Sequence, residues 1–161
     1  MPTPKSKEQT IVEAVVTQML TITVANGYQT DIGKLHVEDS RPNWDEADDL
    51  PAISVFTGTV TSTEADDEGI NVFRMMPVMI KAFLKRLDTP AMTADLARKA
   101  ISDLMRAIRS NDQWIVSAVK KATFTKEVSH GIEFSGTEFE ITGVQVEIEI
   151  QYLAQKFNME S

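Results

Sequence analysis

The strongest constraint on the fold is a run near the C-terminal end in which apolar and polar residues alternate without a break. Every second position is apolar: Val144, Val146, Ile148, Ile150 and Tyr152. The positions between them hold only Gln and Glu. Successive side chains of a β-strand point to opposite faces of the sheet. Residues 138–153 are therefore predicted to form a strand with one face on a core and one polar face directed away from it.

Two amphipathic helices are also predicted. The first covers residues 7–24, because Ser6 and Gln9 form a capping box and Asn26-Gly27 is a typical helix end. The second begins at a Thr89 cap followed by Pro90. Its apolar positions recur at helical spacing: Leu96, Ile101, Leu104, Met105 and Ile108.

The remaining segments predict strands at 34–38, 52–61, 70–86, 116–126 and 128–134. Pro77 has no backbone N–H, so it predicts an edge or a break within 70–86. The order α-β-β-β-α-β-β-β favours an α+β fold: a mixed, mostly antiparallel sheet with both helices packed on one face. We expect residues 1–161 to form a single domain, with flexible ends at 1–6 and 156–161.

Composition excludes several classes of protein. The chain has no Cys, which excludes disulfides, thiolate zinc sites and Cys nucleophiles. A net charge of -8 argues against a protein that coats nucleic acid, since neutralising phosphates requires clustered Lys and Arg. No apolar run suits a signal peptide or a membrane span, so we expect a cytoplasmic protein with no membrane partner.

The motifs that suggest chemistry are incomplete. The helicase box at 45–48 has no phosphate-binding loop before it. Glu64–Gly69 resembles the start of a calcium loop, but its twelfth position is Met75 rather than Glu. His36 and His130 belong to no catalytic motif. We therefore expect no enzyme activity, no catalytic residue, no cofactor and no metal.

Charge is unevenly distributed along the chain. Residues 38–49, 64–68 and 127–149 hold sixteen of the 24 acidic side chains, whereas 74–126 holds eleven of the 16 basic ones. Oppositely charged regions suit head-to-tail association of identical copies. A mixed, solvated surface is an equally good interpretation of the same pattern.

The order of segments in the N-terminal half suggests a family. The capped helix leads into Gly27–Gly33, a short strand, an acidic loop and the strand that begins in Leu50–Gly58. This order resembles the N-terminal half of the tail terminator proteins of long-tailed bacteriophages, and of related minor tail proteins in prophages. The resemblance is one of pattern and brings no catalytic motif with it.

The resemblance implies a structural protein whose copies close into a ring, expected to be a hexamer. Such a ring caps the tail tube, stops tube polymerisation and provides the surface that joins the head. The implied partners are other copies of the chain, the tail tube protein and a head-completion or connector protein, while DNA passes through without specific binding. The implied location is the host bacterial cytoplasm during assembly and then the virion tail.

Within this framework two loops are candidate interfaces. In the acidic loop, Trp44 could anchor a partner or cover the core locally, and Arg41 could contact a partner or organise a local salt bridge. The predicted hairpin after the second strand could form an arm whose tip is acidic: Asp66, Asp67 and Glu68.

A third candidate is the polar face of the last two predicted strands, which carries four carboxylates: Glu138, Glu140, Glu147 and Glu149. In a ring, such an acidic face would line the lumen and repel DNA phosphates. An ordinary hydrophilic sheet face is the alternative. At the level of the whole protein, the alternatives are another neck or head–tail connector protein, or a monomeric or dimeric α+β binding module.

Overall fold

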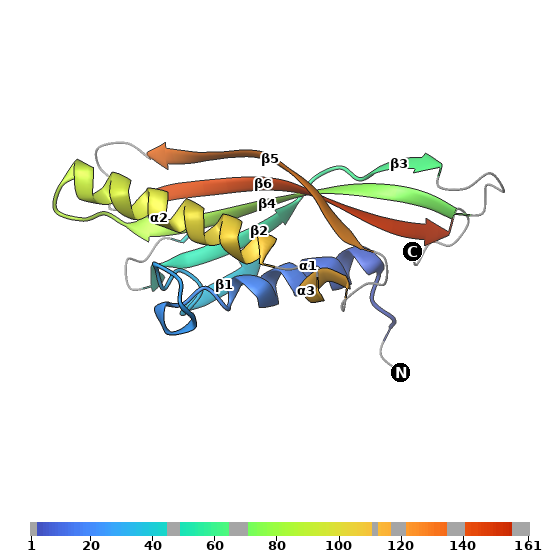
Figure 1. The fold of residues 1–161 in the computed structure, drawn as a ribbon, viewed down its shortest axis with the longest axis horizontal. Helices are drawn as coiled ribbons and strands as arrows, with labels where there is room; N and C mark the ends of the chain where they lie inside the picture. The colour runs from blue at the N-terminus through green and yellow to red at the C-terminus, as the bar shows by residue number, and fades with distance from the viewer. Residues whose placement is uncertain are drawn as a thin grey trace.

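The computed structural model describes residues 3–44, 49–64, 71–110, 113–116, 122–134 and 141–155. Figure 1 shows an elongated molecule in which long strands run along the longest axis and the helices lie beside them. In chain order the elements are α1 (Lys7–Met19), the 3₁₀ turn η1 (Val24–Asn26), β1 (His36–Asp39), β2 (Ala52–Thr57), β3 (Thr61–Glu64), β4 (Asn71–Lys85), α2 (Pro90–Arg109), α3 (Gln113–Val116), β5 (Thr123–Phe134) and β6 (Ile141–Gln155). Residues 156–161, predicted to be a flexible end, lie outside the described ranges.

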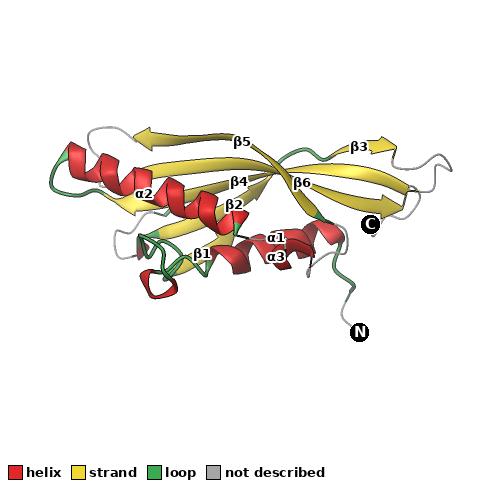
Figure 2. Ribbon diagram, viewed as in Figure 1, coloured by secondary structure: helices red, strands yellow, loops and turns green. Residues whose placement is uncertain are grey.

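The six described strands form one mixed sheet in the order β1-β2-β4-β6-β5, and β3 pairs with β4. The β1–β2 pair is parallel, and the other pairs are antiparallel. The long helices α1 and α2 lie on the same side of this sheet (Figure 2). The predicted α+β class, the mostly antiparallel sheet and the helices on one face are thus confirmed.

The core lies between the helices and one face of the β4–β6 pair. These strands remain in register from Asn71 opposite Gln155 to Lys85 opposite Ile141. Val78 pairs with Ile148, and Ile80 with Val146, and the relative exposure of all four side chains is 0%. Full burial of each such side chain stabilises the fold by roughly 1.5–3 kcal/mol. The alternation predicted for 144–152 is confirmed, because its apolar row is buried in this core.

Helix α1 begins where predicted but ends earlier. The Ser6 hydroxyl caps it by accepting a hydrogen bond of 3.1 Å from the N–H of Gln9. After Met19 the chain turns, and the N–H of Gly33 donates to the carbonyl of Ile22 at 3.0 Å. A Cβ on Gly33 would lie 2.0 Å from the Met19 carbonyl oxygen. The predicted extension to residue 24 is wrong, because the chain turns here and lets a glycine pack on the helix end.

Strand β1 is displaced along the chain from the predicted 34–38. It begins at His36, so Leu35 precedes it and is 51% exposed, whereas Val37 packs against the core. The parallel register places the start of β1 beside the start of β2, with His36 opposite Ala52. Leu35 is therefore left at the end of the sheet.

In α2 the predicted cap is present, but the side of the helix that is buried is not the one predicted from the apolar spacing. Thr89 accepts a hydrogen bond of 3.1 Å from the N–H of Met92, and Pro90 is the first helical residue. The side chains of Leu96, Ile101 and Met105 are only partly buried. Small residues let the helix lie close to the sheet, and the buried apolar positions are Ala97, Ala100, Leu104, Ala107 and Ile108.

Pro77 does not interrupt β4, contrary to the prediction of an edge or a break. The single predicted strand 52–61 is instead two strands, β2 and β3, which pair with successive parts of β4. Between them Gly58 donates its N–H to the Pro77 carbonyl at 2.9 Å. The N–H and C=O groups of a strand residue point to the same side, so the N–H that Pro77 lacks would face this β2–β3 junction. The missing N–H of Pro77 therefore removes no backbone hydrogen bond between β4 and β6.

The strands predicted at 116–126 and 128–134 are one strand, β5, preceded by the short helix α3. Its register with β6 shifts twice, between Phe124 and Lys126 and between Glu127 and Ser129. Such bulges insert extra residues into a strand without ending it. The break in alternation near residue 127 therefore marks a bulge rather than a turn.

Candidate functional site

The sheet face that points away from the helices, here called the outer face, is covered at one end by the loop that joins β1 to β2. We call the described residues of this loop, 40–44 and 49–50, the lid. At its start Ser40 has a φ of 60°, and its N–H donates to the carbonyl of Val55 at 2.8 Å. This left-handed residue reverses the chain immediately after β1 and directs the lid onto the outer face.

Trp44 attaches the lid to the sheet. Its side chain is only 2% exposed, and the indole N–H donates to the hydroxyl of Ser54 in β2 at 2.9 Å. Around it lies a small apolar cluster that is separate from the main core: Leu50, Ala52, Phe83 and Ile141. Trp44 therefore acts as a local cover, which is one of the two roles that the sequence left open for it.

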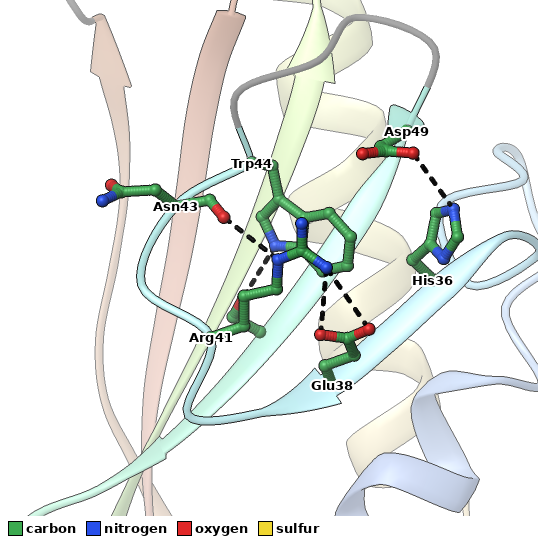
Figure 3. A network of polar contacts seen from close by, with 7 residues as sticks. His36, Glu38, Arg41, Asn43, Trp44 and Asp49 are labelled. Atoms are coloured by element: carbon green, nitrogen blue, oxygen red, sulfur yellow. Dashed lines mark hydrogen bonds and ion pairs between the residues drawn. The ribbon is translucent and has the colours of Figure 1, made fainter.

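Arg41 lies over Trp44 on the lid. Its guanidinium carbon is 3.8 Å from the centroid of the Trp44 ring system, and the close-up view shows this stacking (Figure 3). The guanidinium also pairs with Glu38 at 3.3 Å and donates to the carbonyl of Asn43 at 3.2 Å. Arg41 thus organises a local salt bridge and a cation–π contact within the lid.

The other neighbour of Trp44 is His36 in β1. The ring centroids lie 5.3 Å apart, and the imidazole Nε2 is 3.7 Å from a carboxylate oxygen of Asp49 (Figure 3). One aromatic side chain is thus held by a cation and by an imidazole. This network fixes the lid at one end of the outer face, and it leaves no room for a second molecule over the indole.

Beyond the lid the outer face is lined by half-buried apolar side chains. This stripe, here called the outer stripe, consists of Phe56, Met75, Pro77 and Met79. The strand register places Phe56 opposite Met79. Both lie on the face of the sheet opposite to the residues that contact the helices, because successive side chains alternate between the two faces. No described helix packs on this side of the sheet.

The acidic face is only partly within the described residues. Glu147 and Glu149 are half-buried on the outer face, whereas Glu138 and Glu140 lie outside the described ranges. In register, Glu147 lies between Met79 and Ser129, and Glu149 lies between Pro77 and Lys126. In the described part of the sheet, these two carboxylates therefore border the outer stripe rather than other acidic residues.

The predicted hairpin arm is described only at its base. Strands β3 and β4 pair from Thr61 opposite Met75 to Glu64 opposite Val72. The acidic residues Asp66, Asp67 and Glu68 lie outside the described residues. Of the sequence-predicted interface residues, the structure brings together Arg41 and Trp44, and it places both away from the hairpin base.

A pocket that sequence reasoning missed lies at the end of the sheet where β4 finishes and β2 begins. We call it the end pocket; its volume is about 300 Å³. Its apolar lining comes from four segments: Val24, Ile32, Pro51, Leu84, Leu87 and Leu96. Val24 is 54% exposed and Leu87 is 42% exposed, so its rim shows apolar surface to solvent. No sequence motif marks such a pocket, since it arises where loops meet.

Two buried polar side chains hold the elements together. The Tyr152 hydroxyl in β6 donates to Glu8 in α1 at 2.6 Å. Burial, followed by this hydrogen bond, raises the pKa of Tyr152 from 10.0 to about 12, although Arg74 nearby acts in the opposite direction. In α2, Asp103 is 1% exposed and binds the segment around Thr30.

The two histidines lie far apart, and the described residues contain no cluster of metal-ligating side chains. His36 is in β1 and His130 in β5, the two ends of the sheet order, and His130 contacts Glu127, which also pairs with Arg109 at 3.0 Å. Among the described residues no three His, Asp or Glu side chains are grouped as metal ligands would be.

Within the described ranges, none of the helices has both the length and the apolar character required to cross a membrane. Comparison with models of protein families and with curated proteins found no match for this chain.

Proposed function

We propose that the chain is a structural protein of a phage or prophage tail, whose copies form a ring that caps the tail tube. The observation that carries the proposal is the outer face: one side of the sheet is covered by α1 and α2, and the other leaves the outer stripe half-exposed. A sheet face of this kind suits burial against another protein. The kind of partner is suggested by the segment order, which resembles that of tail terminators and implies other copies of the chain and the tail tube protein.

The mechanism is geometric. Contacts between two different patches of identical copies generate a closed ring when the rotation between neighbours closes. A ring seated on the tube end adds one layer and no longer offers the interface that tube subunits repeat. Its exposed side then receives the head-completion or connector protein. Assembly takes place in the host cytoplasm, and the ring remains in the virion tail.

The acidic residues fit the same proposal. If Glu147 and Glu149 face the lumen, their charge repels DNA phosphates, and the genome passes without binding. In that case the wall of the lumen would adjoin the outer stripe, which a neighbouring subunit or the tube could cover.

Tube capping can be tested directly. Purified tail tube protein is polymerised with and without the protein, and tube lengths and labelled ends are measured by electron microscopy. We expect shorter tubes with label at one end only, and weaker capping by the outer-stripe variant Met79→Asp. A matched control is Lys99→Asp on the exposed side of α2, where Lys99 pairs with Asp95 at 3.0 Å.

The same assay distinguishes the alternatives. Binding to a portal protein rather than to tube ends would favour a neck or connector protein. A protein that remains monomeric or dimeric and leaves tube length unchanged would favour the binding-module alternative and contradict the capping proposal.

A further inference from the structure

Four polar side chains of the described residues line the end pocket, and two of them are bonded to α2. The N–H of Gln29 donates to the carboxylate of Asp103 at 3.1 Å, and the side-chain amide of Gln29 donates to the same helix at 3.4 Å. Thr30 donates both its N–H and its hydroxyl to Asp103. In the described lining, the polar side chains that remain for a ligand are those of Asp31 and Lys85.

Asp31 and Lys85 carry opposite charges but do not pair with each other. Within the described part of the chain, the ammonium group of Lys85 is exposed and makes no hydrogen bond or ion pair. One carboxylate oxygen of Asp31 accepts the N–H of Val24 at 2.8 Å, and no described residue bonds to the other oxygen. An ionised carboxylate accepts about four hydrogen bonds, so Asp31 keeps most of its capacity. The pocket therefore offers a ligand both a negative acceptor and a positive donor.

The rest of the described lining is aliphatic. Ile32 and Leu84 are each only 1% exposed, so they form the floor of the pocket, while Val24 and Leu87 form its rim. The volume of about 300 Å³ is at the lower end of the range for small-molecule pockets, which is about 300–1,000 Å³. This lining and this size suit a small ligand with a short aliphatic group, whose burial on the floor is favourable.

The wall that carries Asp31 is held in place by the protein itself. Asp103 is 1% exposed and anchors the two residues immediately before Asp31 to α2. Asp31 in turn holds Val24 at the rim through its hydrogen bond. Binding therefore does not have to order this side of the pocket, a cost that would otherwise lower the affinity.

We propose that the end pocket binds a free α-amino acid with an aliphatic side chain. The ammonium group of the ligand pairs with Asp31, its carboxylate pairs with Lys85, and its side chain lies on Ile32 and Leu84. The pocket presents both charges beside an aliphatic floor, and a complementary ligand carries both charges beside an aliphatic group. An α-amino acid does so in one small molecule, whereas the end of a polypeptide carries only one of the two charges. This site goes beyond the proposed function, because neither ring formation nor tube capping depends on it.

The proposal is tested with leucine and with three analogues that each lack one of its groups. Glycine lacks the aliphatic side chain, isopentylamine lacks the carboxylate, and isocaproate lacks the ammonium group. Isothermal titration calorimetry of the full chain at neutral pH measures their dissociation constants. We expect leucine to saturate a single site per chain. Each analogue should bind on the order of tenfold more weakly, since it loses one of the three contacts.

Two variants assign the two charged contacts to their residues. Lys85→Met should weaken leucine binding on the order of tenfold and leave isopentylamine binding unchanged, because that analogue has no carboxylate. Asp31→Asn should weaken leucine binding likewise and leave isocaproate binding unchanged. The asparagine oxygen still accepts the N–H of Val24, so the rim keeps its shape. Lys99→Met is the matched control, since it removes a lysine that pairs with Asp95 on α2, and it should bind leucine as the native chain does.

The crossed pattern separates a local effect from a loss of folding, because an unfolded variant would bind none of the compounds. A native chain that shows no saturable leucine binding by calorimetry or by NMR shifts would overturn the proposal. Isocaproate or N-acetylleucine that binds as tightly as leucine would also overturn it. In that case the ligand is a simple anion, such as the carboxyl end of a peptide, and Asp31 does not contribute to binding.

Discussion

The carboxylate of Asp103 in α2 accepts two hydrogen bonds from Thr30, one from its hydroxyl at 2.6 Å and one from its N–H at 2.7 Å. A third comes from the N–H of Gln29 at 3.1 Å. Because Thr30 and its neighbours also line the end pocket, this buried carboxylate fixes one wall of that pocket to the helix. Arg106, one turn further on, donates to the carbonyl of Gly27 at 2.6 Å and secures the same segment.

The first prediction concerns this anchor. Asp103→Ala should lower the free energy of unfolding by about 2–4 kcal/mol, since it leaves buried donors of the Thr30 segment without an acceptor. Asp103→Asn should lower it less, because the amide oxygen still accepts. Urea denaturation followed by circular dichroism measures both. Asp95→Ala, which removes only an exposed ion pair with Lys99, should cost less than about 1 kcal/mol; an equal loss in Asp95→Ala and Asp103→Ala would contradict the anchor role.

A pair of glycines gives the second prediction. Gly33→Ala should destabilise the fold by about 1–3 kcal/mol, because the new Cβ would lie 2.0 Å from the Met19 carbonyl and force the backbone apart. Gly131→Ala is the matched control, since a Cβ there meets nothing within 4 Å. Thermal unfolding of the two variants tests the contrast. Similar melting temperatures would show that Gly33 is not tightly packed against the helix end.

The third prediction concerns the lid. Trp44→Ala should cost about 3–5 kcal/mol, because it empties the apolar cluster under the lid. Arg41→Ala should cost only about 0.5–1 kcal/mol, since it removes an exposed cation–π contact and leaves the indole in place. Denaturant unfolding of the two variants measures the ratio. A small effect of Trp44→Ala would mean that the lid opens easily and that Trp44 is available to a partner after all.

The fourth prediction concerns pH. The pKa of Tyr152 is raised from 10.0 to about 12, so the folded protein favours the neutral phenol more than the unfolded chain does. This contribution to stability is complete below pH 10 and is lost as the pH rises from 10 to about 12. Unfolding free energies at pH 9 to 12 should therefore fall more steeply for the native chain than for Tyr152→Phe. Parallel curves would contradict the shifted pKa.

Much of the fold can be predicted from the sequence, because the patterns that specify its helices and strands involve residues close together in the chain. The alternation at 144–152 places β6, and the Ser6 and Thr89 caps place the starts of α1 and α2. The places where the structure differs from the prediction depend on contacts between residues far apart in the chain. Pro77 is tolerated because Gly58 meets it at a strand junction.

The candidate sites can be predicted from the sequence less well than the fold can. The sequence marks Trp44 and Arg41 as separate candidate interface residues of one loop, yet only the fold shows that Arg41 stacks on Trp44 and that Trp44 covers the sheet. Asp103 interrupts no apolar pattern and gives no signal of burial, because its three donors lie more than 70 residues away. The end pocket combines η1, the β2 start, the β4 end and α2, and no single segment encodes it.

The fifth prediction addresses the acidic residues of the outer face. If Glu147 and Glu149 line an open lumen, the double charge reversal Glu147→Lys and Glu149→Lys should leave ring formation intact and slow the passage or release of DNA. Electron microscopy measures ring formation, and filter binding of duplex DNA measures the new affinity. Loss of rings in a folded variant would place the two residues in the contact between subunits instead.

The mass of the protein in solution shows whether copies of this chain associate into closed rings, as proposed above. Light scattering over a range of protein and salt concentrations, with electron microscopy of the same samples, gives both the mass and the shape. We expect one discrete multiple of the monomer mass and particles with an open centre, formed alone or on added tube ends. A monomer at every concentration that also fails to bind tube ends would contradict the proposed ring.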